Sequence, residues 1–107
     1  MNSQSITVGK LRIDQVAHKA TMNGDPLHLT HNEFTLLVCL ACNAGRVLTW
    51  QSLLNDAWGL GIWEGGREMV KMAVYRLRQK IGDNPDNPEF ILTVRGVGYT
   101  MIVHDEE

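Results

Sequence analysis

The spacing of the apolar residues changes twice along the chain, and this change limits the possible folds more than any other feature. Apolar and polar residues alternate near the N-terminus, as they do in half-buried strands. In the middle of the chain apolar residues recur every three or four positions, which is typical of helices, and short apolar runs flank two glycines near the C-terminus. This order predicts an α+β fold, and 107 residues suffice for one hydrophobic core.

A small antiparallel sheet is predicted near the N-terminus. Its clearest signal is Asn23-Gly24, because a two-residue hairpin loop that matches the twist of its strands needs positive φ at both positions. Gly9-Lys10 predicts a second turn. The predicted strands are residues 6–8, 11–14, 16–22 and 26–29.

Two helices are predicted next. The first begins at a capping box, in which the Thr30 hydroxyl accepts from the Glu33 amide and the Glu33 carboxylate accepts from the Thr30 amide. Gly45 is expected to end this helix in a left-handed conformation. The second helix is short, is capped by Thr49 and ends near Trp58-Gly59.

A third, basic helix is predicted over residues 67–81 after a glycine-rich loop. It carries five Lys or Arg residues and one Glu, so its net charge is +4, whereas the whole chain has −2. This segregation favours a positive face that attracts phosphate backbones. Taken alone, such a helix is more simply interpreted as one with a charged face exposed to solvent. Two short helices, a basic helix and a glycine-tipped hairpin with Arg95 at its base, in that order, instead predict a winged helix-turn-helix.

Five short motifs support this prediction by their order and spacing. They are Leu29-Thr30-x-x-Glu33-Phe34-x-Leu36-Leu37, Gly45-Arg46-Val47-Leu48-Thr49, Leu53-Leu54-x-x-x-Trp58-Gly59, Arg76-Leu77-Arg78-x-Lys80 and Thr93-Val94-Arg95-Gly96-Val97-Gly98-Tyr99. From about Ser5 to Val103 the chain resembles the DNA-binding effector domain of OmpR/PhoB-type response regulators. The resemblance implies an N-terminal four-stranded antiparallel sheet, three helices and a C-terminal β-hairpin wing. The third helix is expected in the major groove and the wing at the minor groove.

The basic helix is predicted to read bases. Arg76 falls where the family places a base-reading arginine, whose fork can donate two bonds to guanine O6 and N7. Met72 can contact a thymine methyl group. Met72, Ala73 and Arg76, together with Met69, are expected on one exposed face, away from the core residue Leu77.

Phosphate contacts are predicted around this face. Arg78 falls where the family places a phosphate-binding arginine. For Trp50 two alternatives stay open, since its indole can pack against the core or donate to a phosphate. The predicted phosphate-binding residues are Trp50, Arg67, Lys71, Tyr75, Arg78 and Lys80. The wing residues that the resemblance implies are Thr93, Arg95, Gly96 and Gly98, and an arginine in a narrow minor groove senses DNA shape.

The basic helix departs from the family at several positions. Where the family usually has Asp and His, this chain has Lys71 and Ala73, and Tyr75 stands where a basic residue is common. The arginine usual at the helix start falls on Glu68, with Arg67 one residue earlier. The base preference therefore does not follow from the resemblance.

The resemblance also implies partners. The loop from Leu60 to Gly66 corresponds to the segment that faces RNA polymerase in activators, so Ile62 and Trp63 are expected to contact polymerase or else to fold back on the core. Residues 1–107 are expected to be one effector domain, with the phosphorylated receiver domain of the phosphorelay outside them. The expected function is sequence-specific binding of double-stranded DNA in transcription regulation, in the cytoplasm, as the output of a bacterial two-component system. The domain is expected to be a monomer alone and a tandem dimer on direct repeats. The alternative is a winged-helix protein-interaction module without sequence-specific DNA reading.

Other classes fit less well. No catalytic triad or nucleotide-binding motif is present, so neither an enzyme nor a cofactor is expected. His28-x-x-His31 and Cys39-x-x-Cys42 suggest zinc at first, but His31 and Cys39 would lie about 12 Å apart along one helix. Zinc ligands lie within about 4 Å of each other, so no metal is expected and the cysteines are interpreted as free thiols. The sequence shows neither a membrane span nor a secretory signal.

Overall fold

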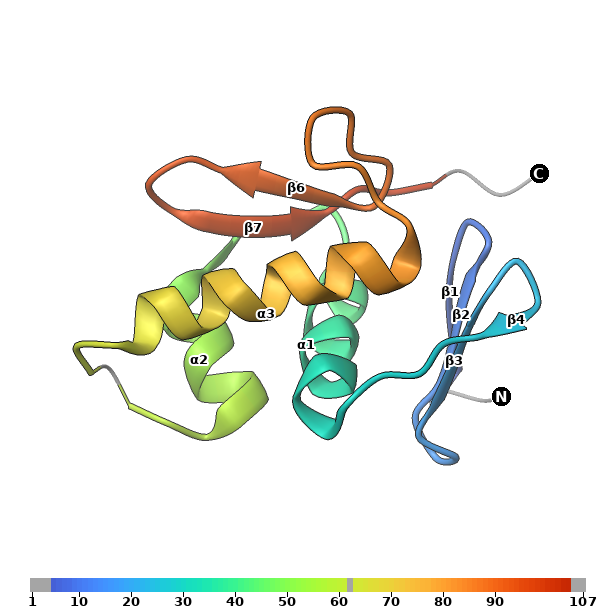
Figure 1. Ribbon diagram of the computed structural model, residues 1–107, viewed down its shortest axis with the longest axis horizontal. Coiled ribbons are helices and arrows are strands. Elements are labelled where there is room, and N and C mark those ends of the chain that lie inside the picture. The colour runs from blue at the N-terminus through green and yellow to red at the C-terminus, as the bar shows by residue number, and fades with distance from the viewer. Residues whose placement is uncertain (1–4, 62, 105–107) are drawn as a thin grey trace.

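A computed structural model describes residues 5–61 and 63–104, and it has the predicted order of strands, helices and hairpin (Figure 1). The N-terminal strands are β1 (Ser5–Val8), β2 (Leu11–Asp14), β3 (Lys19–Met22) and β4 (Asp25–Pro26). The helices are α1 (His31–Cys42), α2 (Trp50–Trp58) and α3 (Gly66–Ile81). The remaining strands are β5 (Leu48–Thr49), β6 (Ile91–Val94) and β7 (Gly98–Met101).

The N-terminal sheet is antiparallel, with strand order β1-β2-β3-β4. Asn23 and Gly24 have φ values of 54° and 88°, as the predicted two-residue turn requires. The third strand is shorter than predicted, because Asp14 Oδ1 accepts from the amides of Val16 and Ala17 at 3.1 and 3.0 Å and closes a turn there. The fourth strand is only two residues long, so the predicted strand over residues 26–29 is wrong in its extent.

The capping box of α1 forms as predicted. Thr30 Oγ1 accepts from the Glu33 amide at 3.2 Å, and Glu33 Oε1 accepts from the Thr30 amide at 3.0 Å. Gly45 has the predicted left-handed conformation, with a φ of 87°, but the prediction that it ends the helix is wrong, since the C-cap is Asn43. Asn43 Nδ2 donates to the Cys39 carbonyl at 2.8 Å and ends the helix early. Gly45 instead donates its amide to the Met101 carbonyl at 2.8 Å, which ties the chain to β7.

The caps of α2 and α3 agree with the sequence. Thr49 Oγ1 accepts from the Ser52 amide at 3.0 Å, and Gly59 ends α2 in the left-handed conformation. Gly82 ends α3 in the same way, while its first residue is Gly66, one position earlier than predicted. Strand β5, which the sequence did not predict, pairs with β7 in a three-stranded sheet of order β5-β7-β6.

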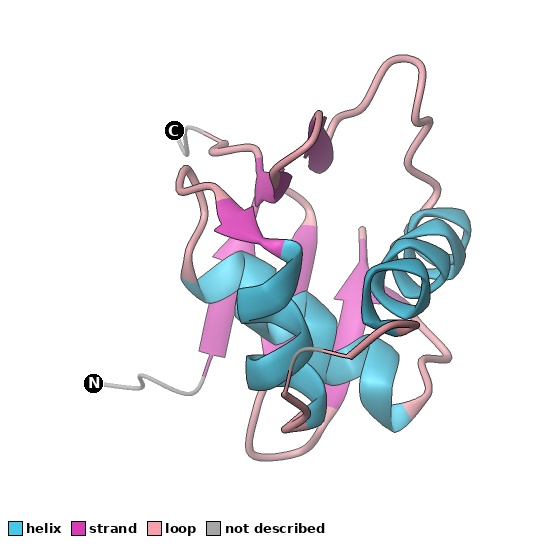
Figure 2. Cartoon of the chain, turned by 90° about the vertical axis from the view of Figure 1, so that its left-hand side faces the viewer, coloured by secondary structure: helices cyan, strands magenta, loops and turns pink. Residues whose placement is uncertain are grey.

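The hydrophobic core lies among the three helices and the inner faces of both sheets. In Figure 1, α3 runs across the molecule with the β6–β7 hairpin along one side and α1 and α2 along the other. Figure 2 looks nearly along α3 and shows that its outer side is not covered by another element. Leu77 is fully buried, which confirms the predicted helix phase. Other fully buried side chains are Leu11, Leu36, Leu37, Leu40, Leu53, Leu54, Val70, Ile91 and Met101.

A buried carboxylate fixes the hairpin at the end of α3. Asp83 is 6% exposed and follows the C-cap of α3. Its Oδ1 atom accepts from the amides of Glu89 and Phe90 at 2.7 and 3.1 Å, and Oδ2 accepts from the Ile91 amide at 2.8 Å. Hydrogen bonds to a buried charged group are among the stronger ones in proteins. The hairpin is therefore held in a defined position beside α3.

Candidate nucleic-acid interface

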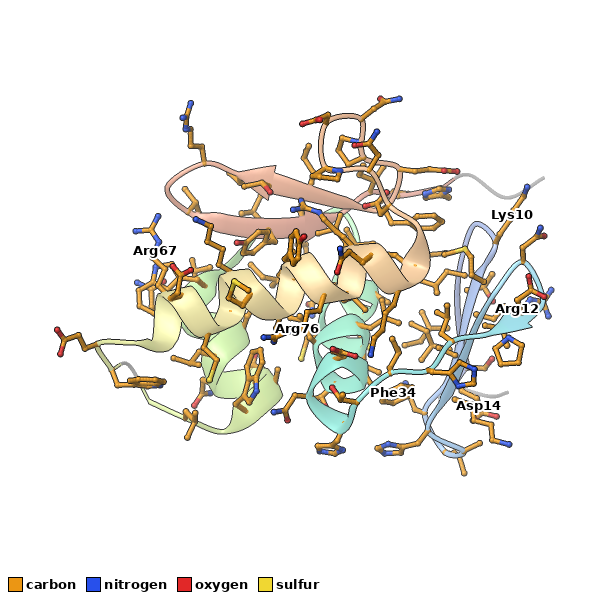
Figure 3. The ribbon with its side chains drawn as sticks, viewed as in Figure 1. Lys10, Arg12, Asp14, Phe34, Arg67 and Arg76 are labelled. Carbon is orange, nitrogen blue, oxygen red and sulfur yellow. The ribbon has the colours of Figure 1, made fainter. Side chains whose placement is uncertain are left out.

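The outer side of α3 carries most of the predicted contact residues. Arg67 and Arg76 extend to opposite edges of the helix, Arg67 on the side of the hairpin and Arg76 on the side of α1 (Figure 3). Met72 is 38% exposed and Tyr75 is 53% exposed, so both can meet a ligand. Lys71 is also exposed. All five residues are therefore exposed on the outer side of α3.

Ala73 does not belong to this surface. Its side chain is 5% exposed and lies in the core cluster, and Met69 beside it is half-buried. Residue 73 is three positions after the buried Val70 and therefore lies on the same side of the helix. The prediction that Ala73 lies on the exposed face with Met72 and Arg76 is wrong for this reason.

Two residues that the sequence predicts to bind phosphate, Arg78 and Lys80, bind other groups within the domain. Arg78 Nη2 donates to the Ile91 carbonyl at 2.9 Å and to Thr93 Oγ1 at 2.8 Å, which ties α3 to β6. Lys80 Nζ lies 2.7 Å from Glu33 Oε1 and ties α3 to α1. Both charges therefore stabilise the packing of α3 within the domain.

The pKa of Glu33 reflects this pairing. Burial acts to raise the pKa of its carboxyl, but hydrogen bonds from the Lys80 ammonium and the Thr30 amide, with the Lys80 charge, outweigh burial. The result is a pKa below the ordinary value. Glu33 is therefore ionised in the folded domain at neutral pH.

Of the four predicted wing residues, Thr93, Arg95 and Gly96 are exposed and Gly98 is buried. Arg95 is exposed near the tip, and Gly96 has a φ of 76°, which the turn requires. Gly98 has another role than the predicted turn, because a Cβ there would overlap the carbonyl oxygen of Leu48 on β5. The Thr93 hydroxyl is exposed but already accepts from Arg78.

A cleft of about 480 Å³ separates the first half of α3 from the wing. Its charged lining contains three cations and two carboxylates. Tyr99 lines this cleft and is half-buried, and burial raises the pKa of its phenol above the ordinary value. The charges of Arg78 and Arg67 act to lower this pKa, and the charge of Glu68 acts to raise it. The lining residues are Trp50, Glu64, Arg67, Glu68, Lys71 and residues 93–99.

The structure shows one of the two alternatives left open for Trp50. Its ring is half-buried and packs against the core. Trp50 also lines the cleft. Its backbone amide donates to the Val97 carbonyl at 3.2 Å, which joins the start of α2 to the wing. The packing role is therefore what the structure shows, and a phosphate contact from the cleft remains a proposal.

The loop between α2 and α3 leaves an aromatic side chain exposed. Trp63 is 47% exposed and lies against the glycines at the start of α3, where a Cβ on Gly65 would overlap its ring. It is not part of the core cluster. Leu60 is 40% exposed on the same loop. Ile62, predicted alongside Trp63, lies outside the described residues.

Other site chemistries have little support in residues 5–61 and 63–104. No group of three His, Cys, Asp or Glu residues there is placed to hold a metal ion. No helix in the same ranges combines the length and apolar character needed to cross a bilayer. Cys39 is half-buried and burial raises the pKa of its thiol, with smaller contributions from Asp56 and Cys42, while Cys42 is exposed.

Sequence reasoning missed the acidic side of the cleft and the long-range ties of α3. Glu64 and Glu68 were not assigned to a site, and the Glu33–Lys80 pair joins residues 47 positions apart. The capping box did signal that Glu33 is structurally important. No local pattern indicates which lysine lies above it.

The arrangement defines a winged helix-turn-helix domain, with α2 and α3 as the helix pair and β6–β7 as the wing. The family described as "Transcriptional regulatory protein, C terminal" matches residues 24–101. The chain is 41% identical over 97 residues to the DNA-binding response regulator MtrA of Mycolicibacterium smegmatis, covering 91% of this chain and 42% of MtrA. It thus spans less than half the length of that relative. The chain belongs to this family of transcriptional regulatory domains.

Solved structures agree with this assignment. The RstA DNA-binding domain of Klebsiella pneumoniae, determined in complex with the RstA box, has a TM-score of 0.87 and 34% identity, covering 94% of this chain and 99% of that domain. The response regulator DrrB of Thermotoga maritima, an OmpR/PhoB homologue, has a TM-score of 0.81 and 33% identity, covering 92% of this chain and 44% of DrrB. The predicted fold and OmpR/PhoB resemblance are therefore confirmed.

Proposed function

We propose that this domain binds double-stranded DNA in a sequence-specific manner and regulates transcription as the output domain of a two-component response regulator. The observation that carries the proposal is the uncovered outer side of α3, flanked by the exposed cations Arg67, Lys71 and Arg76, beside a wing with the exposed Arg95 near its tip. A helix fits the major groove, and an arginine-bearing hairpin fits the adjacent minor groove. The RstA domain, similar in sequence and fold, was crystallised on its DNA box.

The proposed contacts fall into three groups. Arg76 and Met72 read base edges, through guanine O6 and N7 and through a thymine methyl group. Phosphates are bound along the flanks of α3 and the start of α2, which fixes the register without reading sequence. The wing contributes Arg95 and the short turn at Gly96. The proposed phosphate-binding residues are Trp50, Arg67, Lys71 and Tyr75.

Selection of bound sequences from a random duplex pool at about 0.1 M salt tests this function, because screening there leaves short-range contacts intact. The wild-type domain is expected to enrich a defined motif. Arg76→Ala should cost about 1–3 kcal/mol and blur one base position of that motif. Lys71→Ala is the matched control, since loss of a phosphate contact should weaken all sequences alike and lower the salt slope by about one.

Equal losses on specific and random DNA for Arg76→Ala would contradict its base-reading role. Binding without enrichment would reduce the domain to an electrostatic module. If the domain bound no DNA at all, the protein-interaction module would become the better description.

We further propose two protein partners. A second copy of the domain binds beside the first on a direct repeat, and RNA polymerase binds the α2–α3 loop through Trp63 and Leu60, which are 47% and 40% exposed. Aromatic side chains at partly exposed sites often dominate interface energetics. A receiver domain would lie in the part of the regulator beyond this chain, as the length of MtrA suggests. The site of action is the cytoplasm, where the chromosome lies.

A further inference from the structure

The centre of the DNA-facing side of α3 is not cationic. Arg67 and Arg76 extend to opposite edges of the helix (Figure 3). Between these edges lie residues four, seven and eleven positions after Glu68, which share one line along an α-helix. All four members of this line are exposed, and they are Glu68, Met72, Tyr75 and Gln79.

Glu68 is the polar group on this line that is free to meet a base. Gln79 Nε2 already donates to the Tyr75 hydroxyl at 3.3 Å. The ion pair between Lys80 and Glu33 is the one ion pair within residues 5–61 and 63–104, so no cation lies within ion-pair distance of Glu68 in the free domain. The Glu68 carboxylate lies on the first turn of α3, at the mouth of the cleft that also holds Arg67 and Lys71.

The chemistry of a carboxylate limits what Glu68 can face on DNA. An ionised carboxylate only accepts hydrogen bonds, and it is repelled by phosphates and by the acceptor atoms of guanine. In the major groove it fits the N4 amino group of cytosine. Arg67 and Lys71 on the wing side can bind the neighbouring phosphates and offset the repulsion from the backbone.

We propose that Glu68 determines specificity by accepting a hydrogen bond from the N4 amino group of a cytosine in the major groove. The inference rests on the proposed function, because it assigns one more base pair to the same recognition helix. The contacted base pair lies beyond that of Met72, toward the N-terminus of α3. Guanine and thymine present no amino donor in the major groove, and the N6 amino group of adenine lies beside the acceptor N7, which repels a carboxylate.

The test compares the sequence preferences of the wild type, Glu68→Ala, Glu68→Gln and Glu64→Ala, each selected from the same random duplex pool. Glu64 is the matched control, since it lines the same cleft from the loop before α3 and carries the same charge. All three substitutions are at exposed positions, and circular dichroism and thermal unfolding check that the fold is kept. Competition binding on single-base variants of the selected site then gives the discrimination at each position.

The wild type should prefer cytosine at one base pair by about fivefold to tenfold, which is the lower end of a good base contact. Glu68→Ala should remove that preference, and Glu68→Gln should shift it toward adenine, which an amide side chain reads through N6 and N7. Glu64→Ala should keep every preference.

The proposal would be overturned if both Glu68 variants kept the base preferences of the wild type and bound all sequences more tightly by the same factor, as in Glu64→Ala. Glu68 would then act only as a source of electrostatic repulsion. A change at a position where the wild type does not prefer cytosine would also overturn it. A wild-type domain that enriches no motif would instead contradict the proposed function itself.

Discussion

At the scale of single residues, one carboxylate oxygen of Glu33 accepts hydrogen bonds from residues of two parts of the fold. Its Oε1 accepts from the Thr30 amide at 3.0 Å, which caps α1, and from the Lys80 ammonium at 2.7 Å, which joins α1 to α3. The side chain is only 6% exposed, so water does not replace these partners easily. The recognition helix therefore depends on a carboxylate far from the proposed DNA contacts.

We expect Glu33→Gln to destabilise the domain at pH 7, by about 1.5–3 kcal/mol if the bond to a charged partner is lost. The folded pKa of Glu33 lies below its ordinary value of 4.5, so its contribution is present above that value and is lost as the pH falls through the folded pKa. Urea unfolding between pH 3 and 7 measures this effect. The wild type should progressively lose its advantage over Glu33→Gln as the pH falls below 4.5 and through the folded pKa of Glu33.

Gln79→Ala serves as a control for this experiment, because residue 79 is exposed and joins no other element. Its unfolding free energy should follow the pH dependence of the wild type. A constant difference between the wild type and Glu33→Gln at every pH would show that ionisation of Glu33 does not stabilise the fold.

At the scale of elements, Arg78 sets the position of the wing. Its guanidinium joins the last turns of α3 to the carbonyl of Ile91 and the hydroxyl of Thr93 on β6, while Asp83 holds the first residues of the same strand. In the proposed complex, the spacing between α3 and the wing must match that between two grooves of DNA. We therefore propose that Arg78 supports DNA binding by positioning the hairpin.

We expect Arg78→Ala to lower the free energy of unfolding by about 1–3 kcal/mol, since two hydrogen bonds of a charged group are lost. Amides of β6 and β7 should exchange faster with solvent, as measured by hydrogen exchange. Arg76→Ala, whose side chain makes no such contact among the described residues, should leave both measurements near the wild type. Equal exchange rates in Arg78→Ala and the wild type would assign Arg78 to phosphate binding instead.

At the scale of the whole molecule, the domain has a radius of gyration of 13.1 Å, and the start of α3 and the wing tip lie at the end opposite the N-terminal sheet (Figure 1). In the proposed complex, two copies side by side on a duplex would each turn the outer side of α3 to the same face of DNA. Because half-sites on one face are about 10–10.5 base pairs apart, the spacing of a direct repeat decides whether both copies bind.

We expect the free domain to sediment as a monomer and to form a two-to-one complex on a direct repeat of that spacing. A single half-site should bind one copy, and a repeat lengthened by about half a helical turn should lose cooperativity. Analytical ultracentrifugation with labelled duplexes measures these stoichiometries. One copy bound to the properly spaced repeat would contradict the tandem arrangement.

The sequence by itself determined the elements whose signals are local. Asn23-Gly24 requires positive φ, Thr30 and Glu33 satisfy each other's amides within one turn, and Gly59 and Gly82 end helices, so each acts within a few residues. The helix phase around Leu77 followed from the 3.6-residue period in the same way.

Only the tertiary structure decided which partners the charged side chains of these elements bind. Arg78 and Lys80 look like solvated cations in the sequence, yet their partners on β6 and α1 lie 13 to 47 positions away. Ala73 turned inward because the neighbouring elements cover that side of α3, and β5 forms because β7 offers it hydrogen bonds. Such contacts depend on which surfaces meet after folding, and no local pattern encodes them.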